Sequence, residues 1–170
     1  GVPFTQLNDP GKTAAEMIAD GKIIGWFQGR LECGDRALGN RSILADPRDP
    51  DMKRKVNATI KYREDFRPFA PSILLEKIDE YFENAVPTPF MEKASLIRPE
   101  KQKLIPAVTH VDGTGRLQTV TKEQNCLYWA LIDEFRKITG IPFVLNTSFN
   151  LRGEPLVCTP KDALRTFFTS

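Results

Sequence analysis

Apolar and polar positions along the 170-residue chain alternate in short blocks that predict strands separated by helices and polar loops. Apolar blocks with the length of strands occur at Lys22–Gln28, Ser42–Ala45, Phe69–Leu75, Arg116–Val120 and Ile141–Leu145. Helix patterns occur near Thr13–Gly21, Asp51–Ile60, Glu76–Phe82, Thr121–Gly140 and from Thr159-Pro160 onward. This alternation predicts a single α/β domain, residues 1–170.

Two sequence patterns predict where helices begin. Thr13 with Glu16, and Thr121 with Gln124, have the spacing of a capping box. The second box would open a helix whose inner face carries Leu127, Leu131, Phe135 and Ile138. Glycines at positions 21 and 140 are expected to end these two helices.

The segment Asn84–Pro106 contains four prolines, which argue against long regular elements. Segments of this kind run over protein surfaces and often carry function. We expect a mobile excursion over the surface or a lid above a site.

The composition is that of a globular protein, with 41% hydrophobic and 27% charged residues. No apolar run reaches the roughly 18 residues of a membrane helix, and the first residues lack a signal-peptide pattern, so a cytoplasmic protein without a membrane partner is expected. Cys33, Cys126 and Cys158 are widely spaced, which predicts free thiols, with Cys33 buried rather than nucleophilic. With His110 as the sole histidine, a His-rich metal site or His-dependent triad is poorly supported.

Positive charge is concentrated in one part of the chain. Residues 30–67 hold ten Lys/Arg and seven Asp/Glu, a local charge of +3 (10 − 7), whereas the whole chain carries +2. Lys61, Arg63 and Arg67 can direct several cations at one anion, because alternate side chains of an extended loop point the same way. The alternative is a solvated basic loop whose charges pair with Glu64 and Asp65.

Gly34 and Gly39 bracket Arg36 in a polar loop between two predicted strands. Glycine lets the backbone approach a ligand closely, so Arg36 is a candidate contact for a phosphate or a base. For Arg41 and Arg48 the alternative to a ligand contact is an ion pair with Asp35, Asp46 or Asp49. We expect this structural role for Arg48.

Ser148 and Asn150 follow a predicted buried strand and lie two residues apart. Their hydroxyl and amide groups can bind phosphate oxygens or a carbamoyl group. The alternative is an ordinary polar turn completed by Gly153. Arg116 is a further candidate anion contact, whereas the nearby His110 is expected to be structural. Neither a GxxxxGK[ST] phosphate loop nor a GxGxxG turn occurs.

Four blocks cover most of the chain: RALGNRSILADPR (36–48), REDFRPFAPS (63–72), THVDGTGRLQTV (109–120) and LNTSFNLRGEPLV (145–157). Together they resemble the carboxyl-terminal domain of the O-carbamoyltransferases that act on nodulation factors, cephalosporins and aminoglycosides. That domain is similar in fold to the YrdC-type threonylcarbamoyl-adenylate synthases, whose KxR and SxN motifs resemble Lys61-Tyr62-Arg63 and Ser148-Phe149-Asn150. The resemblance implies a YrdC-like α/β fold, in which a twisted, mainly open sheet with flanking helices surrounds a basic cleft.

The resemblance also implies an activity. ATP, with magnesium, and carbamoyl phosphate would be converted into carbamoyl adenylate, with release of pyrophosphate and phosphate. A larger amino-terminal domain of the same parent chain, from which this domain is expected to be excised, would then transfer the carbamoyl group to a hydroxyl acceptor. Contacts with these small-molecule substrates carry over to Arg36, Lys61, Arg63, Arg67, Arg116, Ser148 and Asn150, of which Arg36, Lys61 and Arg67 would be catalytic. No protein ligand for magnesium is implied.

Two features depart from the family pattern. Gly34-Asp35 stands where the family more often has a glycine-proline pair, and the chain stops at Thr169-Ser170, before a further strand that such domains usually contain. The alternative function is a non-catalytic module that binds nucleotide, or RNA weakly, in the basic cleft, although a net charge of +2 gives this modest support. A third alternative is an inert fragment whose site needs the absent domain.

Overall fold

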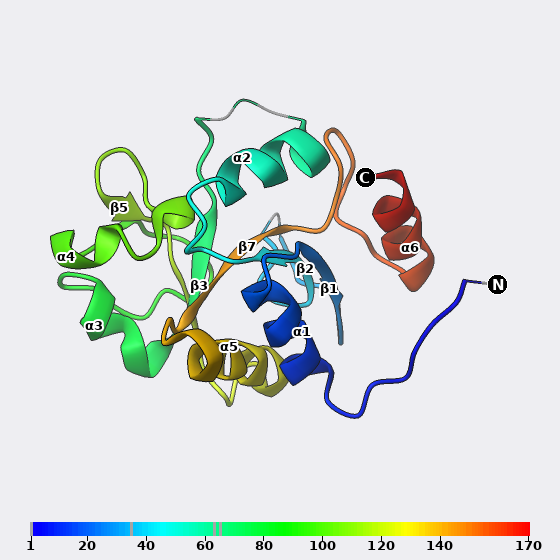
Figure 1. The fold of residues 1–170 in the computed structure, drawn as a ribbon, viewed down its shortest axis with the longest axis horizontal. Coiled ribbons are helices and arrows are strands. Elements are labelled where there is room, and N and C mark those ends of the chain that lie inside the picture. Colours follow the sequence, from blue (N-terminus) through cyan, green and yellow to red (C-terminus); the bar gives the residue numbers. More distant parts are fainter. Residues whose placement is uncertain (1, 35, 63, 65) are drawn as a thin grey trace.

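The computed structural model describes residues 2–34, 36–62, 64 and 66–170, in which helices surround a central sheet (Figure 1). The elements in chain order are α1 (Pro10–Ala19), β1 (Ile24–Phe27), β2 (Arg41–Ala45), α2 (Met52–Val56), η1 (Asn57–Lys61), β3 (Ala70–Leu74), η2 (Leu75–Lys77), α3 (Ile78–Tyr81), β4 (Ser95–Leu96), α4 (Pro99–Gln102), η3 (Pro106–Val108), β5 (Thr114–Gly115), β6 (Gln118–Val120), α5 (Cys126–Thr139), β7 (Phe143–Ser148) and α6 (Pro160–Thr169). All five predicted strands are present, with ends that differ from the prediction by up to three residues.

The central sheet is mixed and has the strand order β1-β2-β7-β3-β6. β7 is antiparallel to both of its neighbours, with Ser148 opposite Ser42 of β2 and Asn146 opposite Ala70 of β3. β3 and β6 pair in parallel. Because β7 is antiparallel to β2 and β3, its carboxyl end lies where those two strands begin. The loops that precede β2 and β3 therefore meet the residues that follow β7.

Helices cover both faces of this sheet. α1 and α5 lie side by side against one face, and α2 lies on the opposite side (Figure 1). The helices contribute fully buried side chains to one core, among them Ile18 of α1, Met52 and Val56 of α2, and Leu131 and Phe135 of α5. The strands that carry the polar loops are thus held from both sides by apolar packing.

Both predicted capping boxes are wrong as helix starts. α1 begins three residues before Thr13, because Asp9 caps it and its Oδ1 accepts a hydrogen bond from the backbone N–H of Lys12 at 2.9 Å. α5 begins after Asn125, whose side chain accepts a hydrogen bond from the backbone N–H of Tyr128 at 3.2 Å. Asp and Asn are at least as strong as threonine at this position, and in α1 a proline also occupies the first helical residue.

α5 buries a different face from the predicted one at its two ends. Leu127 and Ile138 are 60% and 49% exposed, whereas Tyr128 and Ile132 are fully buried. A step of four residues turns about 40° around a helix and a step of three turns about 60° the other way, so Leu127 and Ile138 both lie to one side of Leu131 and Phe135, away from Tyr128 and Ile132. The predicted row therefore matches the buried face in its middle and leaves it towards the ends.

The segment 84–106 contains the two-residue strand β4 and the single turn α4, in keeping with its prolines. The backbone N–H of Thr88 donates to Thr119 Oγ1 at 2.9 Å, and the N–H of Thr119 donates to the Thr88 carbonyl at 3.1 Å, so this segment is tied to β6. None of the helices in the described part of the chain combines the length and the apolar run needed to cross a membrane.

Candidate functional site

Lys61 ends η1 and is almost entirely buried, with 6% of its surface exposed. Its ammonium group donates to the Ser148 carbonyl at 2.6 Å, to Asn150 Oδ1 at 2.8 Å and to the Asn150 carbonyl at 3.0 Å. Ser148 Oγ in turn donates to Asn150 Oδ1 at 2.7 Å. Three predicted site residues from two distant motifs therefore form one cluster.

The local backbone directs Lys61 inward. The helix widens into a π-helical turn over Asn57–Lys61 and ends at Tyr62, whose φ of 45° lies in the left-handed region. That conformation is unfavourable for a bulky residue, and π-helical turns are frequent at functional sites. Arg152 Nη1 donates to the Tyr62 carbonyl at 2.9 Å, so the segment after β7 supports this turn as well.

The segment after β7 is itself a polar turn. Asn150 Nδ2 donates to the Glu154 carbonyl at 2.7 Å, and Gly153 has the left-handed φ of 78° that the turn requires. The two interpretations of this segment from the sequence, a turn and a candidate site, both describe it.

A small pocket of about 120 Å³ shares Ser148 with the Lys61 cluster. Arg36, from the loop before β2, and Arg116, from the segment before β6, also line it. Met91 places the 84–106 segment in the same wall. Sites for drug-sized ligands usually measure about 300–1,000 Å³, so this pocket suits a small anion such as one phosphate group.

Glu32 organises the loop that carries Arg36. Its Oε1 accepts hydrogen bonds from the backbone N–H groups of Leu38 at 2.9 Å, Asn40 at 2.7 Å and Arg41 at 3.3 Å. One carboxylate oxygen therefore satisfies three main-chain donors that the irregular loop would otherwise leave without partners. Glu32 is not among the residues predicted for the site, and its only signal in the sequence is a lone acid just before a glycine-containing basic loop.

The far end of this loop lies on α5. Gly39 has a φ of 107° and sits against the ring of buried Tyr128, so that a Cβ at Gly39 would overlap the ring. Gln28 Nε2 donates to the Gly39 carbonyl at 2.8 Å and to Asn125 Oδ1 at 3.0 Å, which joins the loop to the start of α5. Burial raises the pKa of Tyr128 far above its ordinary value, so its phenol stays neutral.

Arg41 is buried, with 4% exposure, and binds carbonyl groups. Its Nη1 donates to the Gln28 carbonyl at 2.6 Å and to the Asn40 carbonyl at 2.9 Å, and its guanidinium lies 3.6 Å from the centre of the Phe27 ring. These contacts close the base of the loop, and the described aspartates considered as partners, Asp46 and Asp49, pair with Arg48 and Lys55 instead. Asp35, which belongs to the Gly34-Asp35 pair that departs from the family pattern, lies outside the described residues.

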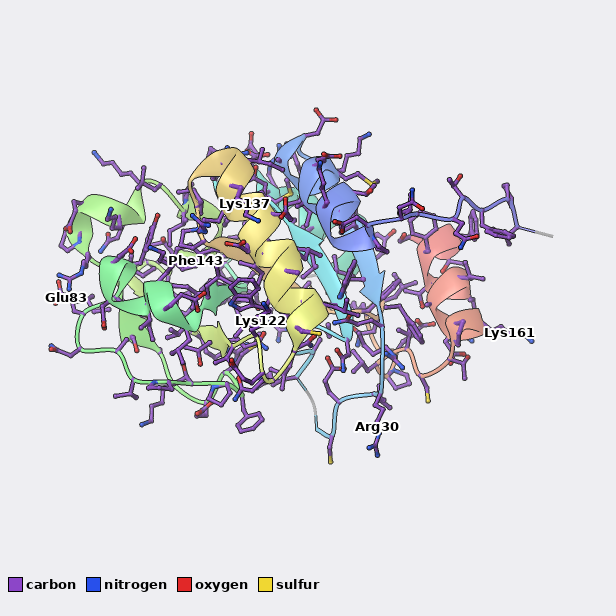
Figure 2. The ribbon with its side chains drawn as sticks, turned by 90° about the horizontal axis from the view of Figure 1, so that it is seen from below. Arg30, Glu83, Lys122, Lys137, Phe143 and Lys161 are labelled. Carbon is purple, nitrogen blue, oxygen red and sulfur yellow. The ribbon has the colours of Figure 1, made fainter. Side chains whose placement is uncertain are left out.

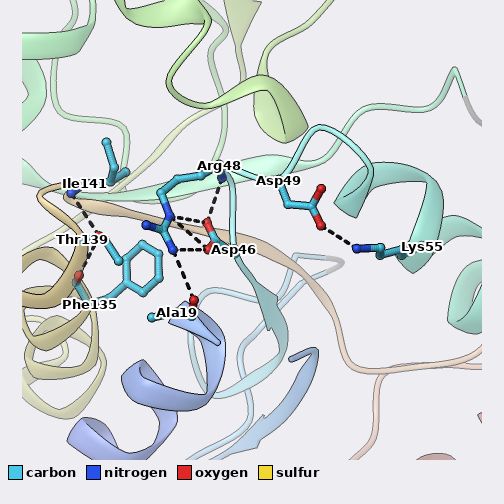
Figure 3. Close-up of polar contacts among 8 residues, drawn as sticks. All are labelled: Ala19, Asp46, Arg48, Asp49, Lys55, Phe135, Thr139 and Ile141. Atoms are coloured by element: carbon cyan, nitrogen blue, oxygen red, sulfur yellow. Dashed lines mark hydrogen bonds and ion pairs between the residues drawn. The ribbon is translucent and has the colours of Figure 1, made fainter. Parts of the chain in front are cut away.

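Arg48 has the predicted structural role (Figure 3). Its Nε lies 2.9 Å from Asp46 Oδ1 and its Nη2 lies 2.6 Å from Asp46 Oδ2, and Nη2 also donates to the Ala19 carbonyl at 3.3 Å. The guanidinium lies 5.5 Å from the centre of the Phe135 ring. Hydrogen bonds with Asp46 raise the pKa of Arg48, which therefore links the end of β2 to α1 and α5 as a cation.

A buried amide network forms the wall behind the pocket. Asn146 of β7, which lines the pocket, donates from Nδ2 to the Ala37 carbonyl, to Ser72 Oγ and to Gln118 Oε1, each at 3.0 Å. Asn146, Ser72 and Gln118 are not among the residues predicted for the site. The one signal for Asn146 is its position two residues before Ser148, which places both side chains on one face of β7.

Arg67 lies apart from the cluster. Its side chain is 56% exposed, and its Nε lies 3.4 Å from Glu64 Oε2. This contact is the ion pair of the solvated-loop alternative, yet the next residue, Pro68, lines the pocket. Arg63, the other predicted cation of this loop, lies outside the described residues, as does Asp65.

Many other basic side chains lie at the periphery of the domain. Figure 2 labels Lys137 on α5, Lys161 on α6 and Lys122 in the turn before α5; all three side chains are exposed, while Phe143 of β7 is fully buried. Lys137, for example, has a side chain that is 53% exposed and pairs with surface carboxylates, whereas Lys61 is held by protein oxygens with 6% of its surface exposed. Burial thus separates Lys61 from the general surface charge.

The remaining candidates lie outside the cluster. Cys33, Cys126 and Cys158 are free and exposed, so the buried thiol predicted at Cys33 is wrong, because its loop projects into solvent. His110 Nδ1 lies 3.0 Å from Thr114 Oγ1, and burial lowers the pKa of His110. Within the described ranges, no group of three or more His, Cys, Asp or Glu side chains is placed to hold a metal ion.

Comparison with known proteins relates the chain to longer nodulation proteins. It is 52% identical over 172 residues to nodulation protein NolNO of Sinorhizobium fredii (strain NBRC 101917 / NGR234), covering 99% of this chain and 25% of that protein. It is 50% identical over 166 residues to nodulation protein NolO of Bradyrhizobium diazoefficiens, covering 96% of this chain and 30% of that protein. The chain therefore spans between a quarter and a third of the length of these relatives.

A solved structure shares the fold. The crystal structure of full-length HypF in the phosphate- and nucleotide-bound form matches with a TM-score of 0.63 at 15% sequence identity, covering 98% of this chain and 20% of that chain. At this identity the likeness concerns the fold alone. It confirms the predicted fold class, a YrdC-like α/β domain.

The family assignment rests on nearly the whole chain. Residues 15–170 match the family described as "Carbamoyltransferase C-terminus". This range holds the Lys61 cluster, the small pocket and the loop organised by Glu32. The chain belongs to the carbamoyltransferase C-terminal family.

Proposed function

We propose that this domain binds ATP and carbamoyl phosphate and forms carbamoyl adenylate for the O-carbamoylation of a hydroxyl acceptor. The observation that carries the proposal is the buried Lys61 cluster beside a small pocket lined by Arg36 and Arg116. Membership of the carbamoyltransferase family supports carbamoyl transfer as the chemistry. The phosphate- and nucleotide-bound form of the structurally similar HypF supports a nucleotide as one substrate.

The proposed reaction has two steps. Carbamoyl phosphate first reacts with water to give carbamate and inorganic phosphate. A carbamate oxygen then attacks the α-phosphorus of ATP, and pyrophosphate leaves with the electrons of the broken P–O bond. Both reactants of the second step are anions, so fixed cations must offset their repulsion. After the one water of the first step has reacted, the cleft must shield the carbamate from bulk solvent, because free carbamate readily loses carbon dioxide.

Three cations in and near the pocket support this proposal. Arg36 and Arg116 line the pocket, where a guanidinium can bind two oxygens of one phosphate. Lys61 would supply a further positive charge, held in place by Ser148, which lines the pocket, and by Asn150. In a partly dry site these charges act more strongly on an anion than they would in water.

Arg67 and Arg63 enter the proposal as further phosphate contacts. Arg67 directly precedes Pro68 of the pocket wall, and its exposed ion pair with Glu64 costs little to exchange for a phosphate. We propose that magnesium arrives on the phosphates of ATP, since its preferred ligands are water and phosphate oxygens.

The rest of the longer protein has a role in the same proposal. The chain spans 25% and 30% of its two nodulation relatives, which leaves most of their length for other functions. We propose that an amino-terminal domain of the parent chain receives the carbamoyl adenylate and positions the acceptor hydroxyl.

Pyrophosphate release from ATP tests the proposed function. The purified domain is assayed with magnesium, with and without carbamoyl phosphate, at matched ionic strength. Release that requires carbamoyl phosphate is the expected result. ATP binding without release, or steeply salt-dependent RNA binding without release, would replace the enzyme with a binding module.

A further inference from the structure

Asn146 is the most deeply buried polar side chain in the pocket wall, with 1% exposure. Its Nδ2 lies 3.0 Å from each of three oxygens, those of the Ala37 backbone, the Ser72 hydroxyl and the Gln118 amide. These contacts hold the side-chain amide from the loop of Arg36, from β3 and from β6. Asn146 is therefore held in place on three sides.

The same contacts decide which way round the Asn146 amide lies. Gln118 Nε2 donates to the Leu38 carbonyl at 2.8 Å, so Gln118 must turn Oε1 towards Asn146. The Ser72 hydroxyl uses its proton on Gln118 Oε1 at 2.7 Å and offers Asn146 a lone pair. The Ala37 carbonyl can only accept. Reversing the amide would place an oxygen against three acceptors, so nitrogen faces the network and oxygen faces away from it.

Asn146 Oδ1 has no hydrogen-bond donor in the described part of the chain and is shielded from solvent. A buried acceptor without a donor is destabilising, and native proteins retain few of them. Asn146 lines the same pocket as Arg36, Arg116 and Ser148. The pocket wall therefore combines cations that suit an anion with an asparagine whose buried amide oxygen lacks an N–H or O–H donor among the described residues.

We propose that Asn146 Oδ1 accepts a hydrogen bond from the carbamoyl N–H of a carbamoyl phosphate whose phosphate contacts Arg36 and Arg116. This inference rests on the proposed function and adds a residue that determines substrate specificity. An ionised phosphate offers no donor, whereas a carbamoyl group carries two N–H groups. Acetyl phosphate is similar in shape but has a methyl group in place of the amino group. Asn146 thus selects a carbamoyl group over other acyl groups.

Titration calorimetry with three ligands tests this inference on the 170-residue chain. The ligands are carbamoyl phosphate, acetyl phosphate and inorganic phosphate, each with the wild type and with Asn146→Ala. The wild type should prefer carbamoyl over acetyl phosphate by about tenfold or more, because a site built for an N–H group rejects the analogue without it. In Asn146→Ala this preference should fall to about twofold, because only the lost amide oxygen distinguishes the two ligands. The affinity for inorganic phosphate should fall by at most about threefold.

Gln118→Ala is the matched control, since it breaks the network but keeps the Asn146 oxygen. It should weaken the binding of all three ligands by the same factor, no larger than the loss that Asn146→Ala causes for inorganic phosphate, and leave the preference for carbamoyl phosphate in place. An Asn146→Ala protein that keeps the preference would overturn the inference. If Asn146→Ala fails to fold, the inference is tested on the wild type alone. Equal affinity of the wild type for carbamoyl and acetyl phosphate, or no affinity for either, overturns the inference.

The pyrophosphate assay separates this inference from the proposed function. Carbamoyl-phosphate-dependent release together with equal binding of acetyl phosphate would retain the proposed function and reject the role of Asn146. Selective binding of carbamoyl phosphate without release would reject adenylate formation and retain the role of Asn146.

Discussion

Lys61 Nζ lies 2.8 Å from Asn150 Oδ1, although 89 residues separate the two along the chain. The contact joins the end of η1 to the turn after β7 and buries the ammonium among protein oxygens. Burial of a charge is costly unless its hydrogen bonds are made, so the turn and the lysine depend on each other. The pocket lined by Arg36 and Arg116 lies beside this pair.

Replacing Lys61 with Met should remove the charge and keep much of the side-chain volume. We expect carbamoyl-phosphate-dependent pyrophosphate release to fall by roughly ten- to hundredfold, since a hydrogen bond to a charged group contributes about 1.5–3 kcal/mol. Lys55→Ala is the control, because Lys55 is 47% exposed, pairs with Asp49 at 2.6 Å and lies outside the predicted site, so release should be unchanged. Equal rates for the wild type and Lys61→Met would rule out a role for Lys61 in the reaction.

Replacing Glu32 with Ala should loosen the loop that carries Arg36. Three backbone N–H groups lose their acceptor, so we expect a loss of about 1–3 kcal/mol in the free energy of unfolding. Amide hydrogen exchange at Leu38 and Asn40 should become faster. Glu32→Gln retains the acceptor oxygen and should stay near the wild type, as should the surface control Glu16→Ala. Unchanged exchange at both amides in Glu32→Ala would contradict this role.

Gly39 and Gly34 form a matched pair for the contact with Tyr128. Both have positive φ values, 107° and 117°, so alanine strains the backbone at either position. Among the described atoms, a Cβ at Gly34 meets nothing within 4 Å, whereas a Cβ at Gly39 overlaps the Tyr128 ring. Gly39→Ala should therefore be less stable than Gly34→Ala by about 1–3 kcal/mol in urea unfolding. Equal stability would mean that the loop does not rest on this ring.

His110 should make stability depend on pH in a defined direction. Burial, opposed by Asp112 and assisted by Arg116 and Lys53, lowers the pKa of His110 below its ordinary 6.5. The unfolded chain then binds a proton near pH 6.5 that the folded chain does not bind, so stability is fully present above pH 6.5 and falls as the pH drops below it.

Urea unfolding between pH 7.5 and 5.5 measures this effect, in a window above the titration of the carboxylates at about pH 4. His110→Gln should flatten the pH dependence there, since the chain has no other histidine. A wild type that gains stability on acidification through this window would show that folding does not lower this pKa.

Patterns that are local in sequence predicted local structure well. The buried strand runs are present, and α6 begins where Thr159-Pro160 indicated, with Thr159 and Asp162 in a capping box. The helix starts at Thr13 and Thr121 were wrong because stronger caps, Asp9 and Asn125, lie a few residues away. When several caps compete, packing of the helix against the sheet selects among them.

The candidate site could be predicted in part. Lys61, Ser148 and Arg36 belong to motifs, so the sequence alone was enough to select them. Glu32 and Asn146 could not be selected in this way, because their roles depend on partners that the fold brings to them. Asn146, for example, meets the Ala37 carbonyl across 109 residues of chain.

The sequence by itself determined the family, the five buried strands and the side chains that carry charge into the site, since motifs and hydrophobic runs are properties of short segments. Only the tertiary structure decided that these side chains meet. With β7 antiparallel to both β2 and β3, the turn after it reaches the loops that precede them, which brings Ser148 beside Lys61 and Asn146 beneath the loop of Arg36. Such an arrangement depends on the packing of the whole sheet, which no single segment contains.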